Sequence, residues 1–311
     1  MAFAPQSSPW ARRRLVALRL TAVGALTAVT VLVVLISVVG VGRSGAVAPV
    51  NPTSGDMRDI ASRRPGLRVL FIGNSLTYVN SLPSMVQEFA AHDPGATPIY
   101  DYEYAPGGAW LYQAAASATL WRLLTGHRWN AVVLQEDSHV TDKSGYASMY
   151  SVPAARQLDD LIGMSRARPV VYETWGYRNG NIALSPSDSY PLMQARAQQA
   201  ALTLRTALRA ELAPVGYAWS EALRLDPSAD LWQADNVHPS PLGTYLAAAV
   251  FYDVLTGRDP ISSHYDAGLD PGTAHWLRTV ARIAVAQVEP DGPTRPRLPA
   301  IRNNPWFDAG G

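Results

Sequence analysis

The sequence contains no cysteine, almost no lysine and almost no net charge, and two of these shortages exclude classes of function. Without cysteine, the 311-residue chain has no disulfide framework, no thiol nucleophile and no cysteine-ligated metal site. Its 26 basic and 25 acidic residues nearly balance, and no basic patch is interleaved with aromatic residues, so we expect no nucleic-acid partner. The six histidines show neither His-x-His nor His-Glu-x-x-His spacing, so we expect no metal ion.

One long hydrophobic run is present, close to the N-terminus. Uncharged, mostly apolar residues from Leu20 to Val41 follow four arginines between positions 12 and 19. As a helix this run would span roughly 33 Å, the hydrocarbon thickness of a bilayer. The preceding arginines predict a cytoplasmic N-terminus, with the rest of the chain outside the cell membrane. A cleaved signal peptide is the alternative, because Ala46-Val47-Ala48 has the small-x-small pattern of a cleavage site. We expect a single-pass anchor, or a secreted protein, and export in both cases.

Composition divides the chain into five segments. A basic cytoplasmic segment (1–19) precedes the anchor or signal peptide (20–42), and a linker rich in proline, serine and glycine follows (43–64). The folded domain is expected at 65–289, within the usual size of one domain. A tail rich in proline, arginine and glycine ends the chain (290–311).

Within this domain, short apolar runs alternate with helical patterns. The alternation predicts an α/β domain, in which a parallel sheet lies between layers of helices. We expect strands at 68–72, 98–103, 131–135, 170–174 and 215–218. We expect helices at 82–91, 109–124, 153–164, 190–212, 242–255 and 273–288.

Two segments carry residues suited to acyl chemistry. Gly73-Asn74-Ser75-Leu76-Thr77 directly follows the first apolar strand, which places the Ser75 hydroxyl at the carboxyl edge of the sheet and at the start of a helix. Far downstream, Asp235 stands three residues before His238, a spacing that allows the carboxylate to orient the ring. Each residue also has an ordinary structural role, Ser75 as a helix cap and His238 at a helix start. Taken together, the two segments indicate a serine esterase.

Four motif blocks, in this order, resemble the SGNH (GDSL-type) hydrolase family. They are Gly73-Asn74-Ser75-Leu76-Thr77, Tyr104-Ala105-Pro106-Gly107-Gly108-Ala109-Trp110, Leu134-Gln135-Glu136-Asp137-Ser138 and Asp235-Asn236-Val237-His238-Pro239-Ser240. The resemblance spans about 68–259 and implies a flavodoxin-like three-layer α/β/α sandwich with five parallel strands. Members of this family are esterases, lipases, thioesterases and carbohydrate deacetylases. The first block departs from the namesake motif, because Asn74 stands where that motif has aspartate.

The resemblance also assigns roles to single residues. It makes Ser75 the nucleophile, His238 the general base and Asp235 the residue that orients the histidine. It assigns the oxyanion hole to the backbone N–H groups of Ser75 and of a glycine in the second block, for which we favour Gly108 over Gly107. The third member of the hole is usually an asparagine, and in this chain Gln135 takes its place. No cofactor is implied.

Aromatic residues follow the second and fourth expected strands and are expected near the site. Trp175 directly follows the fourth strand and Trp110 ends the second block, so we expect both to contact substrate, with a place in the core as the alternative for each ring. The predicted activity is hydrolysis of a carboxylic ester, with an O-acylated carbohydrate favoured over a lipid or another small ester. A non-catalytic module that binds an acylated glycan is the alternative from another class. An acyltransferase that uses the same triad is a third.

Overall fold

The computed structural model describes residues 65–143 and 145–288, and its centre is a parallel sheet. The strands are β1 (Leu67–Ile72), β2 (Ile99–Tyr104), β3 (Ala131–Gln135), β4 (Arg168–Tyr172) and β5 (Glu211–Ala213). They lie in the order β2-β1-β3-β4-β5, and every neighbouring pair is parallel. This is the strand order of flavodoxin-like doubly wound sheets. The predicted α/β class with a five-stranded parallel sheet is confirmed.

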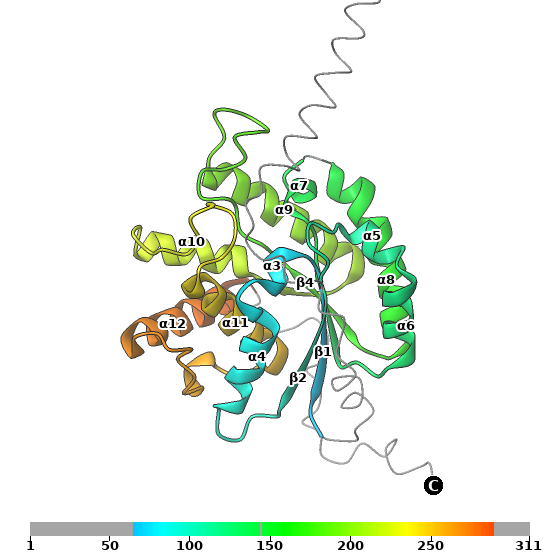
Figure 1. Ribbon diagram of the computed structural model, residues 1–311, viewed down its shortest axis with the longest axis horizontal. Coiled ribbons are helices and arrows are strands. Elements are labelled where there is room, and N and C mark those ends of the chain that lie inside the picture. The colour runs from blue at the N-terminus through cyan, green and yellow to red at the C-terminus, as the bar shows by residue number, and fades with distance from the viewer. Residues whose placement is uncertain (1–64, 144, 289–311) are drawn as a thin grey trace, which may run out of the picture. The chain divides into compact units, whose positions relative to one another are not determined.

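Helices cover both faces of the sheet. The longer ones are α4 (Leu82–Ala91), α6 (Ala118–Gly126), α8 (Val152–Met164), α9 (Tyr190–Leu208), α10 (Val215–Leu225), α11 (Pro241–Thr256) and α12 (Pro271–Val288). The shorter ones are α3 (Ser75–Tyr78), α5 (Leu111–Ala115), α7 (Ser138–Thr141), the π-helix η2 (Ala147–Ser151) and the 3₁₀ turns η1 (Val79–Ser81) and η3 (Pro260–Ser262). Figure 1 shows α4, α10, α11 and α12 on one side of the strands and α5, α6 and α8 on the other.

The alternation of side chains along β1 explains why both faces need cover. Val69 and Phe71 point into a core packed against α4, α10, α11 and α12, whereas Leu70 and Ile72 point into a second core beneath α5, α6, α8 and α9. All four side chains are fully buried. A strand that is buried on both faces contains an unbroken run of apolar residues. In β1 this run is Val69–Ile72.

Three predicted elements differ from the structure. The fifth strand is Glu211–Ala213, and the expected strand at 215–218 is the start of α10. The expected helix 190–212 ends at Leu208, because Arg209 adopts the left-handed conformation (φ 52°) that terminates α9. The expected helix 109–124 is two helices, since Ser117 caps a new start by accepting a hydrogen bond from the Leu120 N–H.

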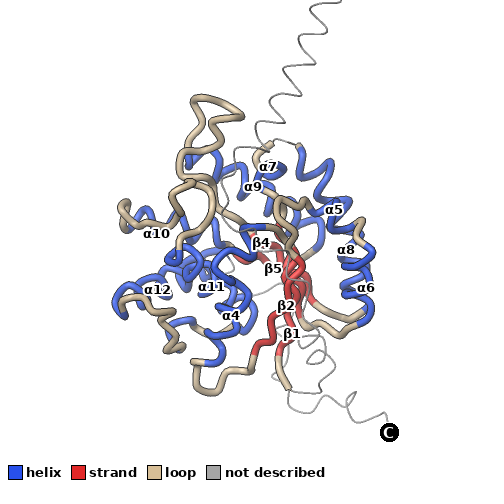
Figure 2. The backbone as a smooth tube through the Cα atoms, in the orientation of Figure 1, coloured by secondary structure: helices blue, strands red, loops and turns tan. Residues whose placement is uncertain are grey.

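The carboxyl ends of β1 and β3 meet at the point where the direction of winding reverses. β2 and β3 pair with opposite edges of β1, so the loops that follow β1 and β3 leave the sheet side by side. Ligands of open α/β sheets bind at such a switch point. Figure 2 shows the loops at this end of the strands as tan connections between the helical layers.

The expectations for residues 1–64 and for 290–311 lie outside the described residues. They comprise the cytoplasmic segment, the membrane anchor or signal peptide, the linker and the C-terminal tail. Within 65–143 and 145–288, no helix has the length and apolarity that a membrane crossing requires.

One carboxyl group, that of Glu173, is buried in the core just after β4. Burial raises its pKa to about 8, although hydrogen bonds from the Gln194 side chain (3.1 Å) and the Tyr217 backbone oppose the rise. The folded protein therefore keeps the proton at pH values where the unfolded chain has lost it. Stability is expected to fall as pH rises from about 4.5 to about 8, by about 3 kcal/mol at pH 7.

Glu173→Gln should remove this pH dependence. The amide keeps an acceptor for the Gln194 side chain but cannot ionise, so the free energy of unfolding near neutral pH should increase. Urea unfolding at pH 5 and at pH 7.5 measures the effect. Asp160→Asn, a substitution at an exposed position of α8, is the control and should leave the pH dependence as it is. An unchanged pH dependence in Glu173→Gln would show that the buried carboxyl is already ionised in the folded protein.

Candidate active site

The turn that carries Ser75 is held from below by the side chain of Gln135. Its Oε1 accepts hydrogen bonds from the Asn74 backbone N–H (2.8 Å) and the Thr77 hydroxyl (2.8 Å). Glycine is required at position 73, because a Cβ there would lie 2.4 Å from Gln135 Oε1 and 2.3 Å from Thr77 Oγ1. Asn74 caps α3 by accepting from the Leu76 N–H (3.1 Å). These contacts fix the position from which the half-buried Ser75 side chain projects.

The loop that carries His238 is organised by Asp235. Asp235 Oδ1 accepts from the backbone N–H groups of Val237 and His238, both at 2.9 Å. The loop closes on itself through the Gln233 N–H, which donates to the His238 carbonyl (2.8 Å), and Ser240 then caps α11. The Asp-x-x-His spacing is therefore a local turn in which one carboxylate holds both the backbone and the ring.

The structure brings Ser75, His238 and Asp235 together in one line. His238 Nε2 lies 2.9 Å from Ser75 Oγ, and His238 Nδ1 lies 2.6 Å from Asp235 Oδ2. The two segments are joined directly by Asn80, whose side-chain amide donates to the Pro239 carbonyl (2.9 Å) and the Thr244 hydroxyl (2.8 Å). Sequence reasoning missed Asn80, because no local pattern marks an exposed asparagine as a bridge between distant segments.

The charge of Asp235 suits its place beside the imidazole. Partial burial raises the pKa of Asp235, but hydrogen bonds from the His238 ring and from the Val237 and His238 backbone outweigh this and lower it overall. The carboxylate stays ionised at pH values where an ordinary aspartate begins to take up a proton. An ionised carboxylate on Nδ1 keeps the proton of a neutral ring on that nitrogen and leaves Nε2 free to accept.

Gln135 was predicted to complete the oxyanion hole, and the hydrogen bonds of its side chain make this prediction wrong. Its amide nitrogen donates to Asn74 Oδ1 (3.0 Å) and to the Glu136 carbonyl (2.8 Å), so both hydrogens are used inside the protein. The extra methylene of glutamine lets the amide reach under Gly73, where it holds the turn that carries Ser75. The side chain is 1% exposed.

The oxyanion-hole role of the Ser75 and Gly108 backbone N–H groups stays a prediction. The Ser75 N–H lies in the first turn of α3, where a helix leaves its N–H groups without intrahelical partners. Gly108 is exposed and adopts a left-handed conformation (φ +66°) that disfavours any other residue. The loop that contains Gly108 is fastened to the nucleophile turn, since the Asn74 side-chain amide donates to the Ala109 carbonyl (3.2 Å).

Two buried acids after β3 support this arrangement and were not assigned roles from the sequence. Glu136 Oε1 accepts from the Leu111 N–H (3.0 Å) and from the Asp137 N–H (2.8 Å), which ties the glycine loop to β3. Asp137 Oδ2 accepts from the Asn74 side chain (2.8 Å). Burial raises the pKa of Glu136, against the opposing effect of these backbone hydrogen bonds and of Ser151. One sequence signal pointed to Glu136 and Asp137, because both directly follow the buried strand β3.

Of the two tryptophans expected to contact substrate, only Trp110 is accessible. Trp175 is 1% exposed, so it presents no face to a ligand, and that prediction is wrong. It stacks on Trp219 with ring centroids 4.1 Å apart and donates from its indole nitrogen to the Val237 carbonyl (3.0 Å). Trp175 therefore supports the histidine loop from within the core. Trp110 is half-buried and lines a pocket between α5 and η2.

No cluster of three or more histidine or acidic side chains suited to a metal ion occurs within 65–143 and 145–288. The chemistry available at this site is that of a hydroxyl, an imidazole and a carboxylate in series. Such a series activates a serine for attack on a carbonyl carbon.

Comparison with solved structures identifies the family. A protein from Slackia heliotrinireducens that is assigned to the SGNH hydrolases is 30% identical in sequence, and the alignment covers 60% of this chain and 98% of that chain with a TM-score of 0.51. The chain belongs to the SGNH (GDSL-type) hydrolase family. As a member of this family, the protein is an ester-hydrolysing enzyme.

A second solved structure shares the fold of the present chain. It is a DUF4886 family protein from Bacteroides uniformis, 17% identical, aligned over 76% of this chain and 100% of that chain with a TM-score of 0.62. No model of a protein family matches the sequence, and no curated protein matches it either. The identification therefore rests on the structural comparison and agrees with the motif blocks.

Proposed function

We propose that the enzyme hydrolyses carboxylic esters through a Ser75-His238-Asp235 triad. The observation that carries the proposal is the unbroken series of contacts from Asp235 Oδ2 to His238 Nδ1 (2.6 Å) and from His238 Nε2 to Ser75 Oγ (2.9 Å). These are the distances at which a base takes a proton from its nucleophile. The substrate we favour is an O-acylated carbohydrate, and the half-buried indole of Trp110 supports this choice.

The proposed reaction has two stages. Ser75 Oγ attacks the ester carbonyl while its proton passes to His238 Nε2, and the negative charge that develops on the carbonyl oxygen is met by the Ser75 and Gly108 backbone N–H groups. The tetrahedral intermediate collapses when His238 gives its proton to the leaving alcohol. Water then attacks the acyl-enzyme with the same imidazole as base, which releases the acid and restores Ser75.

The helix that begins at Ser75 favours this charge development only modestly. It is four residues long, so its backbone N–H groups contribute more through direct hydrogen bonds than through a macrodipole.

We also propose that the domain works outside the cytoplasm, because the apolar run at 20–42 and the arginines before it predict export.

Labelling with a fluorophosphonate tests the proposed function. The reagent should add to Ser75 in the native protein, and peptide mass spectrometry should place the added mass on the peptide that contains it. Ser75→Ala should remain unlabelled, and His238→Ala should be labelled much more slowly because the serine loses its base. A native protein that does not react at Ser75 would contradict the proposal and would favour a module that only binds acylated ligands.

A further inference from the structure

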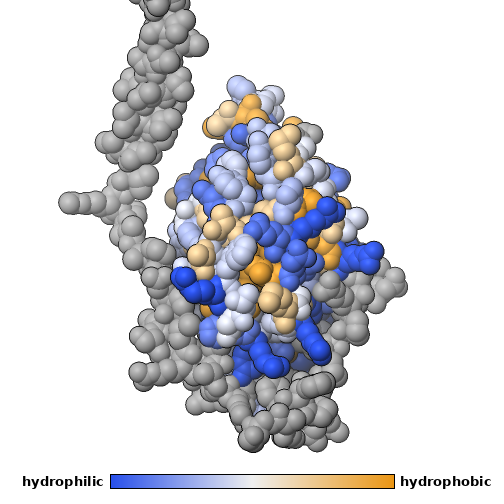
Figure 3. All heavy atoms as spheres, turned by 90° about the vertical axis from the view of Figure 1, so that its right-hand side faces the viewer, coloured by the Kyte–Doolittle hydropathy of each residue, from blue (hydrophilic) through white to orange (hydrophobic). Residues whose placement is uncertain are grey.

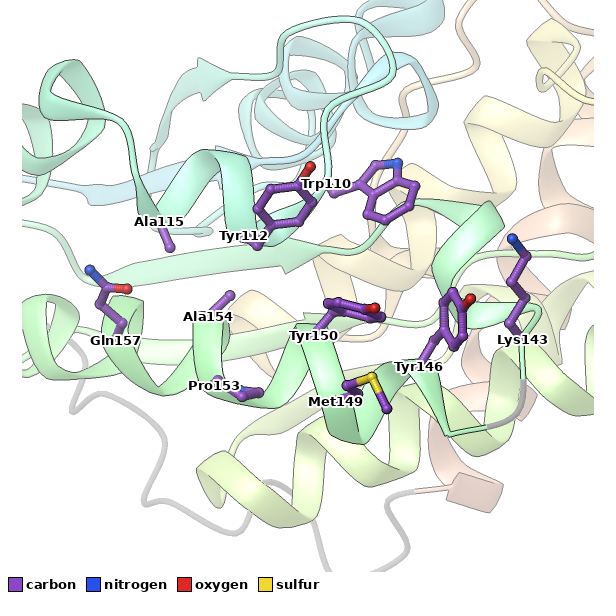
Figure 4. Close-up of a pocket in the computed structure, with 10 residues that line it drawn as sticks. All are labelled: Trp110, Tyr112, Ala115, Lys143, Tyr146, Met149, Tyr150, Pro153, Ala154 and Gln157. Carbon is purple, nitrogen blue, oxygen red and sulfur yellow. The ribbon is translucent and has the colours of Figure 1, made fainter. Parts of the chain in front are cut away.

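A pocket with aromatic walls begins at Trp110, next to the residue whose carbonyl contacts Asn74 in the turn that carries Ser75. It has a volume of about 580 Å³ and opens between α5 and the helical run from η2 into α8. Figure 4 shows Trp110 and Tyr112 on one wall, with Tyr146, Met149 and Tyr150 facing them from the other. The volume lies within the range of roughly 300–1,000 Å³ typical of small-molecule sites.

The rings of each wall hold one another edge to face. Trp110 and Tyr112 have centroids 5.6 Å apart and planes at 86°, and Tyr146 and Tyr150 have centroids 5.1 Å apart and planes at 68°. Such pairs fix the orientation of each ring. Tyr112 is 46% exposed and Tyr150 is 40% exposed, so flat ring surfaces remain open to a ligand.

Polar groups stand at both ends of the pocket. Gln157 lies at one end and Lys143 at the other (Figure 4). Lys143 is the one lysine of the chain, and its ammonium lies 5.1 Å from the centroid of the Tyr146 ring. The neighbouring carboxylate of Asp142 is already paired with Arg196 (2.5 Å) and accepts from Asn181 (2.7 Å). The pocket thus offers ring faces together with hydrogen-bond donors at its ends.

This combination suits a sugar better than an acyl chain. A pyranose ring has an apolar face of C–H groups that packs on an aromatic ring, while its hydroxyl groups bond to amines, amides and tyrosine hydroxyls. A long acyl chain gains by leaving water, and rings exposed by 40–46% beside a Met149 exposed by 64% would leave it partly hydrated. Figure 3 shows the face that carries α6 and α8, where apolar side chains lie in small groups among hydrophilic ones.

The pocket is joined to the nucleophile by short contacts. The Ala109 carbonyl, one residue before Trp110, accepts from the side chain of Asn74, one residue before Ser75 (3.2 Å). Leu111, one residue after Trp110, donates its N–H to Glu136 (3.0 Å). A substrate that spans from Ser75 past the glycine loop would therefore reach the aromatic walls first.

We infer that this pocket is the saccharide subsite of the enzyme, and the inference rests on the proposed function. It holds pyranose rings of an O-acylated oligosaccharide, with the ester at Ser75 and the ring faces on Trp110 and Tyr150. Lys143 donates hydrogen bonds to oxygen atoms of the bound sugars.

Steady-state kinetics on paired substrates test the inference. The panel contains O-acetylated oligosaccharides of xylose, mannose and galacturonic acid, the matching acetylated monosaccharides, 4-nitrophenyl acetate and 4-nitrophenyl decanoate. The native enzyme should prefer at least one oligosaccharide over its monosaccharide. Trp110→Ala and Tyr150→Ala should each lower that preference by about tenfold, through loss of one ring contact, and Tyr150→Ala should leave kcat/KM for 4-nitrophenyl acetate unchanged. Tyr150→Phe keeps the ring face and should retain most of the preference.

A matched control and four contrary outcomes complete the test. Met164→Ala, at the far end of α8 and outside the pocket, should behave as the native enzyme. A native enzyme without oligosaccharide preference, or variants that keep it, would overturn the subsite. Losses confined to the decanoate would overturn it in favour of an acyl-chain site. Failure to turn over 4-nitrophenyl acetate would instead overturn the proposed function, and the subsite with it.

Discussion

Ser75→Ala is expected to lower kcat/KM for 4-nitrophenyl acetate by a factor of about 10⁴ or more, because a triad without its nucleophile loses most of its catalytic power. The Ser75 side chain is half-buried and its hydroxyl contacts His238, so alanine should leave the packing around it unchanged. The fold should therefore survive. Thermal unfolding followed by circular dichroism should give the same Tm for both proteins.

A serine outside the triad provides the control for this result. The Ser84 hydroxyl bonds to Asp101 (3.1 Å) at the surface of α4, and Ser84→Ala should keep the native rate. Residual activity in Ser75→Ala should no longer respond to a fluorophosphonate, because the labelled atom is gone. Turnover close to the native rate in a folded Ser75→Ala would mean that another group attacks the ester.

The sequence predicted those parts of the candidate active site whose residues lie close together in the chain. A buried strand, a glycine turn and a serine fix the place of Ser75 within a few residues, and the strand order puts the loops after β1 and β3 side by side. Asp235 and His238 share one turn, so their contact needs no distant partner. The meeting of the two segments required the family resemblance, since nothing local predicts the bridge made by Asn80.

The wrong predictions depended on packing between distant elements. Gln135 turns its amide under Gly73 because Asn74 and Thr77 lie there, and a sequence does not state which way a side chain at a strand end points. Trp175 is covered by Trp219 from α10. β5 has only three residues, too few for a periodic pattern, so the apolar residues after Pro214 were a better match to a strand than the true one.

Asp235→Asn should have the second largest effect, lowering kcat by about 10³–10⁴-fold, the loss expected when the histidine is held in the wrong tautomer. Asparagine keeps an Oδ1 acceptor for the Val237 and His238 N–H groups, so the loop should hold its shape. The position of Oδ2 becomes an amide nitrogen, which donates to His238 Nδ1 and forces the ring proton onto Nε2. That nitrogen then cannot take the Ser75 proton.

Asp235→Ala separates the two roles of the carboxylate. It removes the backbone acceptor as well as the contact to the ring, so it should also lower the Tm, whereas Asp235→Asn should not. Asp230→Asn is the matched control, because Asp230 is an exposed carboxylate of the same loop that pairs with Arg178, and its kcat should stay native. If Asp235→Asn keeps kcat within about tenfold of native, the carboxylate would serve the loop rather than the imidazole, since the loss of a tautomer-holding charge is far larger than that.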